Sequence, residues 1–153
     1  MTASTRAMAI LDTVSKLAAE YRELTGKPLG VTGEVAEYHA ARLLGLELVG
    51  ARTPGHDATR VVDGKIEKIQ IKGRVLLPDA KPGQRLGTIK QDADADRVVV
   101  VLLNQWFQPT QILEADMGIV RERLARPGSK ARARGALGLA EFRRFAKVVW
   151  RRD

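Results

Sequence analysis

Two runs of alternating apolar and polar residues meet at Asp63-Gly64, inside the stretch GHDATRVVDGKIEKIQIKGR at residues 55–74. An Asp-Gly dipeptide can take positive φ at both central positions of a turn, so it predicts a hairpin with a two-residue loop. That loop fixes the pairing of the two strands and places Asp57 directly opposite Gln70. Residues paired in this way point to the same face, with Cβ atoms about 4.5–5.5 Å apart.

The predicted hairpin gathers side chains with complementary chemistry. Lys72 follows Gln70 by two residues, so it points to the same face, about 6.6 Å along the strand. Asp57, Gln70 and the backbone carbonyl of Ile71 offer the oxygen ligands that Mg²⁺ binds. A nearby ammonium group can stabilise the charge on a phosphate under attack. Spacing alone leaves an alternative open, in which Asp57 is an ordinary turn residue and the other side chains occupy a solvated strand face.

This pattern resembles that of the PD-(D/E)XK nuclease superfamily, whose members share the restriction-endonuclease-like fold. The resemblance rests on Asp57, a spacer of twelve residues and Gln70-Ile71-Lys72, with Gly33-Glu34 upstream on a predicted helix. It covers about Val31 to Arg74, in the order helix, strand, hairpin that the superfamily uses. It implies an α/β fold with a mixed sheet of about five strands flanked by helices. It also implies a metal-dependent endonuclease that hydrolyses phosphodiester bonds in DNA.

The resemblance further implies which residues bind the metal. Asp57, Gln70 and the carbonyl of Ile71 would bind Mg²⁺ or Mn²⁺ as the cofactor. A glutamate of the upstream helix would complete the ligand set, with Glu34 as the matching residue and Glu37 as the alternative. Gln70 departs from the family pattern, because an acidic residue is usual at this position. The Gln-x-Lys version resembles Mrr-like branches of the superfamily, and it removes one negative charge from the metal site.

Other roles and departures follow from the same resemblance. Lys72 would position the attacking water, and Arg74, at the end of the same strand, would help to hold the phosphate. Pro54 stands three residues before Asp57 instead of next to it. The superfamily usually has a helix after the hairpin. Here the Pro and Gly residues between 76 and 96 break any long helix and predict a mobile loop with at most a short helical piece.

The composition favours a nucleic-acid-binding protein. The chain has 153 residues, 44% of them hydrophobic, which fits one globular domain over residues 1–153. Its net charge of +8 and pI near 10.2 favour polyanionic partners, nucleic acid before acidic membrane surfaces. The absence of cysteine excludes disulfides and thiolate metal sites, and neither a signal peptide nor a membrane-spanning run is visible. We therefore expect a cytoplasmic protein that binds DNA and no membrane.

Basic residues concentrate near the C-terminus, with eleven Lys or Arg residues against two acidic ones between Arg121 and Arg152. Residues 120–153 are predicted to form a basic helical region. Together with basic side chains of the loop over 76–96, this region is expected to bind the DNA backbone, and a solvated basic surface is the alternative. The residues assigned to nucleic-acid contact are Arg74, Lys81, Arg85, Lys90, Lys130, Arg132, Arg134, Arg143, Arg144 and Lys147.

Apolar periodicity and stop signals predict the remaining elements. Helices are expected over residues 5–25, from 32 or 33 to 44, over 116–125 and over 139–150, and strands over 46–52, 98–103 and 108–114. The first helix, within residues 1–27, is assigned to packing against the sheet, with a homodimer contact as the alternative. The run over 98–103 is continuously aliphatic, which is typical of a central strand buried on both faces.

Two other classes of function fit the same sequence. The first is a nucleic-acid-binding module with this fold and no catalytic turnover, which the amide of Gln70 in place of an acid favours. The second is a subunit of a larger assembly that binds its partners through a strand edge or the N-terminal helix. Nucleic-acid binding with a steep salt dependence is expected of the first class and not of the second.

Overall fold

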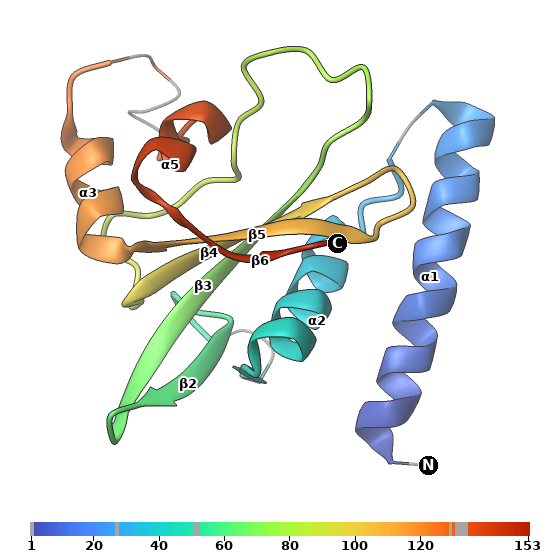
Figure 1. Cartoon of the computed structure of the whole chain (residues 1–153), viewed down its shortest axis with the longest axis horizontal. Helices are drawn as coiled ribbons and strands as arrows, with labels where there is room; N and C mark the ends of the chain where they lie inside the picture. The colour runs from blue at the N-terminus through green and yellow to red at the C-terminus, as the bar shows by residue number, and fades with distance from the viewer. Residues whose placement is uncertain (1, 27, 51–52, 129, 131–134) are drawn as a thin grey trace.

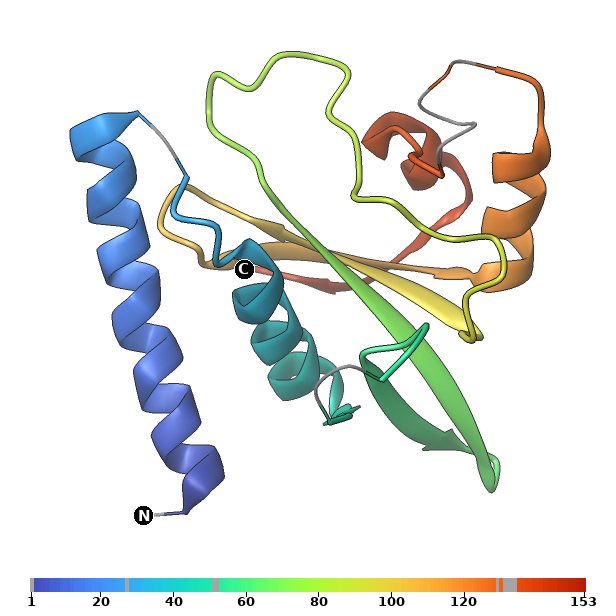
Figure 2. The ribbon, with the colours of Figure 1, turned by 180° about the vertical axis from the view of Figure 1, so that it is seen from behind.

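A six-stranded mixed sheet with helices against both of its faces forms the body of the protein (Figures 1 and 2). The computed structural model describes residues 2–26, 28–50, 53–128, 130 and 135–153. The strands are β1 (Glu47–Leu48), β2 (Ala58–Val62), β3 (Lys65–Val75), β4 (Arg97–Leu103), β5 (Pro109–Asp116) and β6 (Lys147–Arg151). The helices of the described part are α1 (Ala3–Thr25), α2 (Thr32–Leu44), α3 (Met117–Ala125) and α5 (Leu139–Phe145). The predicted α/β class is confirmed, with six strands in place of about five.

The strands lie in the sheet in the order in which they occur in the chain. β3 and β4 run parallel, whereas every other neighbouring pair is antiparallel. A parallel pair needs a crossover connection, and residues 76–96, the crossover loop, provide it. This loop contains neither a helix nor a strand, as predicted, yet Leu86 and Ile89 are buried and bond through their backbone N–H groups to Leu137 and Gly135. The crossover loop is thus packed against the domain.

The hairpin forms at the predicted dipeptide. Asp63 and Gly64 have φ values of 50° and 77°, and the pairs run from Val62–Lys65 to Ala58–Ile69. The predicted turn and register are therefore confirmed. The ladder ends at Ala58, however, so the expected direct pairing of Asp57 with Gln70 does not form. The Asp57 N–H instead donates to the Ile69 carbonyl (2.8 Å).

β4 separates two hydrophobic cores. Its residues Val98 to Leu103 are all at most 1% exposed, as predicted for a central strand. Alternate side chains point to opposite faces of the sheet. One set packs with α3, α5 and the crossover loop, and the other packs with α2. The sheet therefore holds α2 on one face and the crossover loop on the other, which determines where the candidate site can form.

Two predicted elements differ from the structure. The helix predicted over 139–150 ends at Phe145, and β6 follows it as an antiparallel neighbour of β5. Val148, Val149 and Trp150 are β-branched or aromatic, so they favour a strand where the open edge of β5 offers hydrogen bonds. The prediction of a basic helical region over residues 120–153 is therefore wrong for β6. The strand predicted over 46–52 is also shorter, because β1 has two residues.

α1 stands at the outer side of the molecule, next to α2 (Figures 1 and 2). Its only buried residues are Ala18 and Ala19, and Ala18 joins the core around α2. The predicted packing helix is therefore present, but most of its surface is exposed. No helix in the described part of the chain has a segment long and hydrophobic enough to cross a bilayer.

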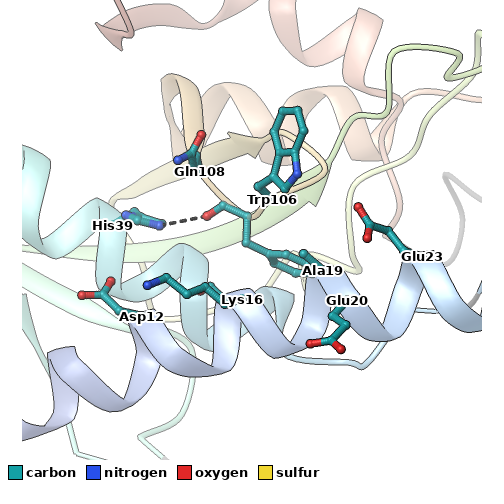
Figure 3. A pocket seen from close by; sticks show the side chains of 10 residues that line it. Asp12, Lys16, Ala19, Glu20, Glu23, His39, Trp106 and Gln108 are labelled. Carbon is teal, nitrogen blue, oxygen red and sulfur yellow. Dashed lines mark hydrogen bonds between the residues drawn. The ribbon is translucent and has the colours of Figure 1, made fainter.

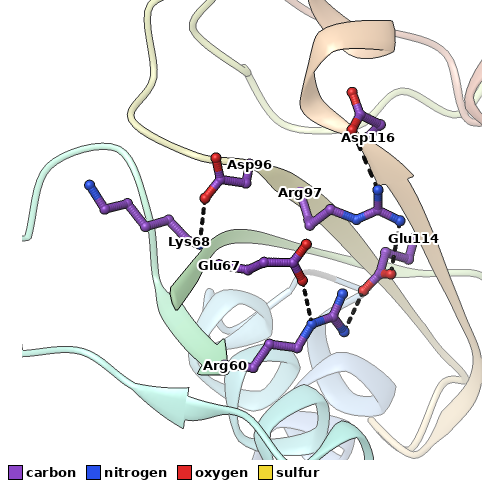
Figure 4. A network of polar contacts seen from close by, with 7 residues as sticks. All are labelled: Arg60, Glu67, Lys68, Asp96, Arg97, Glu114 and Asp116. Atoms are coloured by element: carbon purple, nitrogen blue, oxygen red, sulfur yellow. Dashed lines mark hydrogen bonds and ion pairs between the residues drawn. The ribbon is translucent and has the colours of Figure 1, made fainter. Parts of the chain in front are cut away.

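A network of ion pairs crosses one end of the sheet (Figure 4). At its centre Glu114, which is 6% exposed, contacts Arg60 Nη1 at 2.8 Å and Arg97 Nη2 at 3.1 Å. Arg60 also donates a hydrogen bond from Nε to Glu67 Oε1 (2.9 Å). Burial would raise the pKa of Glu114, but its hydrogen bonds to the two arginines and their charges outweigh burial and hold the pKa below 4.5. The network thus ties β2, β3, β4 and β5 together.

Glu114→Gln should lower the free energy of unfolding by about 2 kcal/mol at pH 7. Breaking a buried ion pair costs about 3–5 kcal/mol, and the quarter-exposed arginines reduce that cost. A carboxylate with a depressed pKa stabilises the fold above its unfolded pKa, and this stabilisation is lost as the pH falls through the folded pKa. Urea unfolding should therefore show the difference from wild type shrinking between pH 7 and pH 3. Glu67→Gln is the control with a smaller expected effect, and a pH-independent difference would contradict the assignment.

Candidate functional site

β2 leaves β3 at the point where the predicted site begins. The last pair of their ladder is Ala58 with Ile69, and no described strand pairs with β3 on this side beyond it. The Asp57 carboxylate occupies this edge, because its Oδ2 accepts a hydrogen bond from the Ile71 N–H (2.7 Å). The N–H and C=O of one strand residue point to the same side of the strand, so the Ile71 carbonyl also points to the open edge. Asp57 and Ile71 thus present oxygens at one place.

Gln70 and Lys72 point to the face of β3 that the crossover loop covers. They line a pocket of about 480 Å³ together with Thr88 and Lys90 of that loop. The Gln70 Oε1 is buried and has no hydrogen-bond partner among the described residues. A buried carbonyl oxygen without a donor costs about 1–3 kcal/mol. Gln70 therefore presents an oxygen that is suited to an electropositive ligand, either a cation or a water molecule.

The Lys72 side chain runs beneath the crossover loop. A Cβ atom built on Gly87 would lie 3.7 Å from Lys72 Cδ and 3.9 Å from its Nζ, which is ordinary van der Waals contact, so the lysine passes directly beneath this residue. Burial lowers the pKa of Lys72 below 10.5, although the negative charges of Asp57 and Glu37 act in the opposite direction. The predicted amine is thus half-buried between the loop and two carboxylates.

Gly73 lets α2 approach this part of β3. A Cβ atom at Gly73 would lie 2.5 Å from the Ala36 Cβ and 3.0 Å from the Thr32 carbonyl oxygen. Real side-chain carbons do not approach so closely, so the glycine is required for the helix to lie against the strand. Ala36 and Gly73 are the immediate neighbours of Glu37 and Lys72 in the chain. The glycine therefore sets how closely α2, which carries Glu37, lies against β3, whose Lys72 side chain points to the opposite face.

Of the two candidate carboxylates of α2, Glu37 is the more buried. Burial raises its pKa from 4.5 to about 7, and the charges of Asp57 and Glu34 add to the increase, while Lys72 opposes it. Glu34 is exposed in the first turn of α2, where a carboxylate also suits the helix dipole. The alternative ligand, Glu37, is therefore half-buried and within electrostatic reach of Asp57 and Lys72, whereas the first choice, Glu34, lies at the exposed start of the helix.

Glu37→Gln should stabilise the metal-free protein at pH 8 by on the order of 1 kcal/mol, with no difference at pH 4. A carboxyl group with a raised pKa binds its proton more tightly when folded, so the fold loses stability as the pH rises from 4.5 to about 7. The estimate is modest because the group is only partly shielded from solvent. Urea unfolding in EDTA at both pH values measures it. An equal difference at pH 4 and pH 8 would contradict the raised pKa.

The predicted nucleic-acid contacts have varied environments. Arg74 Nε and Nη2 donate to Gln84 Oε1 (3.3 and 3.0 Å), and Arg143 Nη1 donates to Gln111 Oε1. Lys90 is exposed and lines the pocket of Gln70 and Lys72. The other described members of the set are exposed at the surface, namely Lys81, Arg85, Lys130, Arg144 and Lys147. Arg132 and Arg134 lie outside the described residues.

A larger pocket of about 770 Å³ lies elsewhere, between α1 and the turn from β4 to β5 (Figure 3). His39 forms part of its wall, and its Nε2 donates to the Phe107 carbonyl oxygen (3.1 Å). Burial lowers the pKa of this histidine, which is 8% exposed. Phe107 is buried, whereas Trp106 beside it is 52% exposed. This pocket contains none of the residues assigned to the metal or to the phosphate.

Sequence reasoning missed the residues that the crossover loop adds to the site. Thr88, Asp92 and Asp94 line the pocket with Gln70. Asp94 Oδ2 also forms an ion pair with Lys68 Nζ (2.8 Å). A loop without periodicity gives no sequence signal for its path, so the residues that it would bring to the pocket could not be predicted.

The oxygen ligands available at the open edge of β3 are of a different kind from those of a metal site made only of carboxylates. Among the described residues, no three His, Cys, Asp or Glu side chains come together closely enough to hold a metal ion. A cation at this edge would therefore depend on amide and backbone oxygens as well as on carboxylates, and Gln70 and Ile71 provide them.

A scan against protein-family models and a search of curated proteins both find no match to this sequence.

Proposed function

We propose that this protein is a restriction-endonuclease-like nuclease that hydrolyses phosphodiester bonds in DNA with Mg²⁺ or Mn²⁺ as cofactor. One observation carries the proposal: the Asp57 carboxylate, bonded to the Ile71 N–H at the open edge of β3, acts electrostatically on Glu37 and Lys72, and the buried Gln70 oxygen nearby has no partner among the described residues. Perturbed titratable groups gathered in one place are typical of catalytic sites. The order of α2, β1 and the β2–β3 hairpin also agrees with the resemblance to the PD-(D/E)XK superfamily.

The residues present fit a divalent cation with oxygen ligands. The second carboxylate oxygen of Asp57, the Ile71 carbonyl and Gln70 Oε1 would hold it, with Glu37 as the ligand from α2. When bound, such a cation polarises a phosphoryl oxygen and lowers the pKa of a water molecule. Burial and the repulsion from Asp57 and Glu34 raise the pKa of Glu37, and a bound cation would offset both.

Lys72 has the position of a water-orienting or charge-stabilising group. Its ammonium has three N–H donors in a half-buried setting, where each electrostatic contact is stronger than in water. The adjoining pocket of about 480 Å³ has room for a phosphate group, and Lys90 stands at its border. Exposed basic residues of the crossover loop and α5 would extend the phosphate contacts over the same face of the sheet.

A cleavage assay tests the proposal. Purified protein is incubated with supercoiled, linear and branched DNA at pH 8 in Mg²⁺, in Mn²⁺ and in EDTA. We expect cleavage of at least one substrate with either metal and none in EDTA. If no substrate is cut under any of these conditions, the nuclease assignment is wrong.

The shortage of carboxylates favours a second candidate, a DNA-binding module without turnover. Such a module would bind DNA with a steep salt dependence, because basic residues would release counterions from the phosphates. Its affinity for Mn²⁺ would not increase when Gln70 is replaced by glutamate. Titration calorimetry of wild type and Gln70→Glu with Mn²⁺ separates the two candidates, since the nuclease predicts a measurable affinity that the added carboxylate increases.

A further inference from the structure

α1 carries an apolar stripe that its own chain leaves largely uncovered, with Val14 alone in it half-buried. Ile10, Leu17, Tyr21 and Leu24 are 47%, 54%, 38% and 78% exposed. The complete stripe is Ala7, Ile10, Val14, Leu17, Tyr21 and Leu24. It follows α1 for almost its whole length of about 34 Å, at 1.5 Å per residue. An apolar surface of this length on a soluble domain marks an interaction site.

The spacing of the stripe identifies the shape of its partner. Its residues recur at intervals of three and four, which is the heptad pattern of a coiled-coil seam. The residues that meet the body of the protein, such as Ala18 and Ser15, lie on another side of the helix. The acidic residues Asp12, Glu20 and Glu23 border the larger pocket beside α2 (Figure 3). The stripe is therefore separate from the side of α1 that meets the domain and from the side that borders the larger pocket. Its spacing suits contact with another helix.

We propose that α1 pairs with α1 of a second copy of this chain in an antiparallel, two-helix contact. In that orientation the seam residues complement one another by size. Ala7, the smallest, faces Leu24 of the other copy, Val14 faces Leu17, and Ile10 faces Tyr21. A parallel pair would place each residue against itself, with Ala7 facing Ala7 and Tyr21 facing Tyr21.

Charge also favours the antiparallel second copy. The chain carries a net charge of +8, so two copies repel each other over most of their surface. The six charged residues of α1, by contrast, cancel to zero, since three are basic and three are acidic. Antiparallel pairing brings the end with Arg6 beside the end with Glu20, Arg22 and Glu23, where two acids outnumber one base, and it places opposite helix dipole ends together.

The size of the contact sets the expected affinity. One helix pair of this length provides an interface near the low end of the standard range, about 1,200 Å² in total. Such contacts are weak, so we expect a dissociation constant in the micromolar range. This inference does not depend on nuclease activity, and its test uses no DNA or metal.

Sedimentation equilibrium of the full chain between about 1 and 200 µM provides the first test. Wild type should follow a monomer–dimer equilibrium, and Leu17→Glu should raise the dissociation constant at least tenfold. Val61→Glu is the matched control, because Val61 is 71% exposed on the hairpin and should not affect association. Circular dichroism of each variant verifies that α1 remains helical. A wild type that stays monomeric, or equal effects of the two variants, would overturn the proposal.

The chain has no cysteine, so engineered cysteines can report the orientation. Ile10→Cys and Tyr21→Cys proteins are oxidised separately and as a mixture. The antiparallel contact predicts a crosslinked dimer that forms mainly in the mixture. Efficient crosslinking of Ile10→Cys with itself would show a parallel pair and refute the antiparallel arrangement.

Discussion

Lys72→Met should slow metal-dependent DNA cleavage by about 10²- to 10³-fold, with DNA binding nearly unchanged. Removing one group that stabilises developing charge in a water-poor site has an effect of this size. Methionine retains the aliphatic length that passes beneath Gly87, so the crossover loop should keep its place. Stability should not fall, because burial already disfavours the charged amine.

Single-turnover cleavage and filter binding measure the two quantities separately. Lys65→Met is the matched control, since Lys65 begins the same strand but is exposed at the hairpin turn. Asp57→Asn is the companion variant: an asparagine oxygen can still accept from the Ile71 N–H, but the negative charge is lost. We expect Asp57→Asn to weaken Mn²⁺ binding at least tenfold. Unaltered cleavage by Lys72→Met would remove this residue from the chemistry.

Gly73→Val should destabilise the protein by roughly 3 kcal/mol and lower its Tm by on the order of 10 °C. Even a Cβ atom at this position collides with the Ala36 Cβ and the Thr32 carbonyl, so α2 must move away from β3. Because α2 carries Glu37, the displacement should also separate this carboxylate from Asp57 and Lys72. The pKa of Glu37 should then return toward 4.5, and Mn²⁺ affinity should fall.

Gly33→Ala is the control for this substitution. Gly33 lies in α2 with open space around the position of a Cβ atom, so alanine should raise stability by about 0.5–1 kcal/mol through helix propensity. Differential scanning calorimetry and Mn²⁺ titration measure both variants. A Gly73→Val protein with wild-type Tm would mean that the helix does not depend on this close approach.

Local signals explain what the sequence could predict. The Asp63-Gly64 turn, the aliphatic run of β4 and the glycine that ends α2 act over a few residues, so the hairpin register, the central strand and the helix end were all predictable. The strand β6 was not predictable from sequence. A short apolar run such as Val148 to Trp150 suits either a helix or a strand, and only pairing with a neighbouring strand distinguishes the two.

The site required information that no local pattern contains. Helical spacing places Glu34 and Glu37 on the same side of α2, and they differ in the structure by burial, since Glu37 is half-buried and Glu34 is exposed. The strand pattern likewise placed Asp57 within the ladder, whereas its carboxylate takes the place of a strand at Ile71. Tertiary packing, through a glycine and a strand end, thus decides which predicted groups meet.

The central claim is that the open edge of β3 binds one divalent cation through Asp57, Glu37, Gln70 and the Ile71 carbonyl. Anomalous diffraction from a crystal soaked in Mn²⁺ tests it most directly. We predict a single peak about 2.0–2.5 Å from an Asp57 carboxylate oxygen and from the Ile71 carbonyl oxygen, with the Gln70 or Glu37 side chain also coordinated. Absence of a peak at this edge in a well-soaked crystal, or a peak held only by other residues, would contradict the claim.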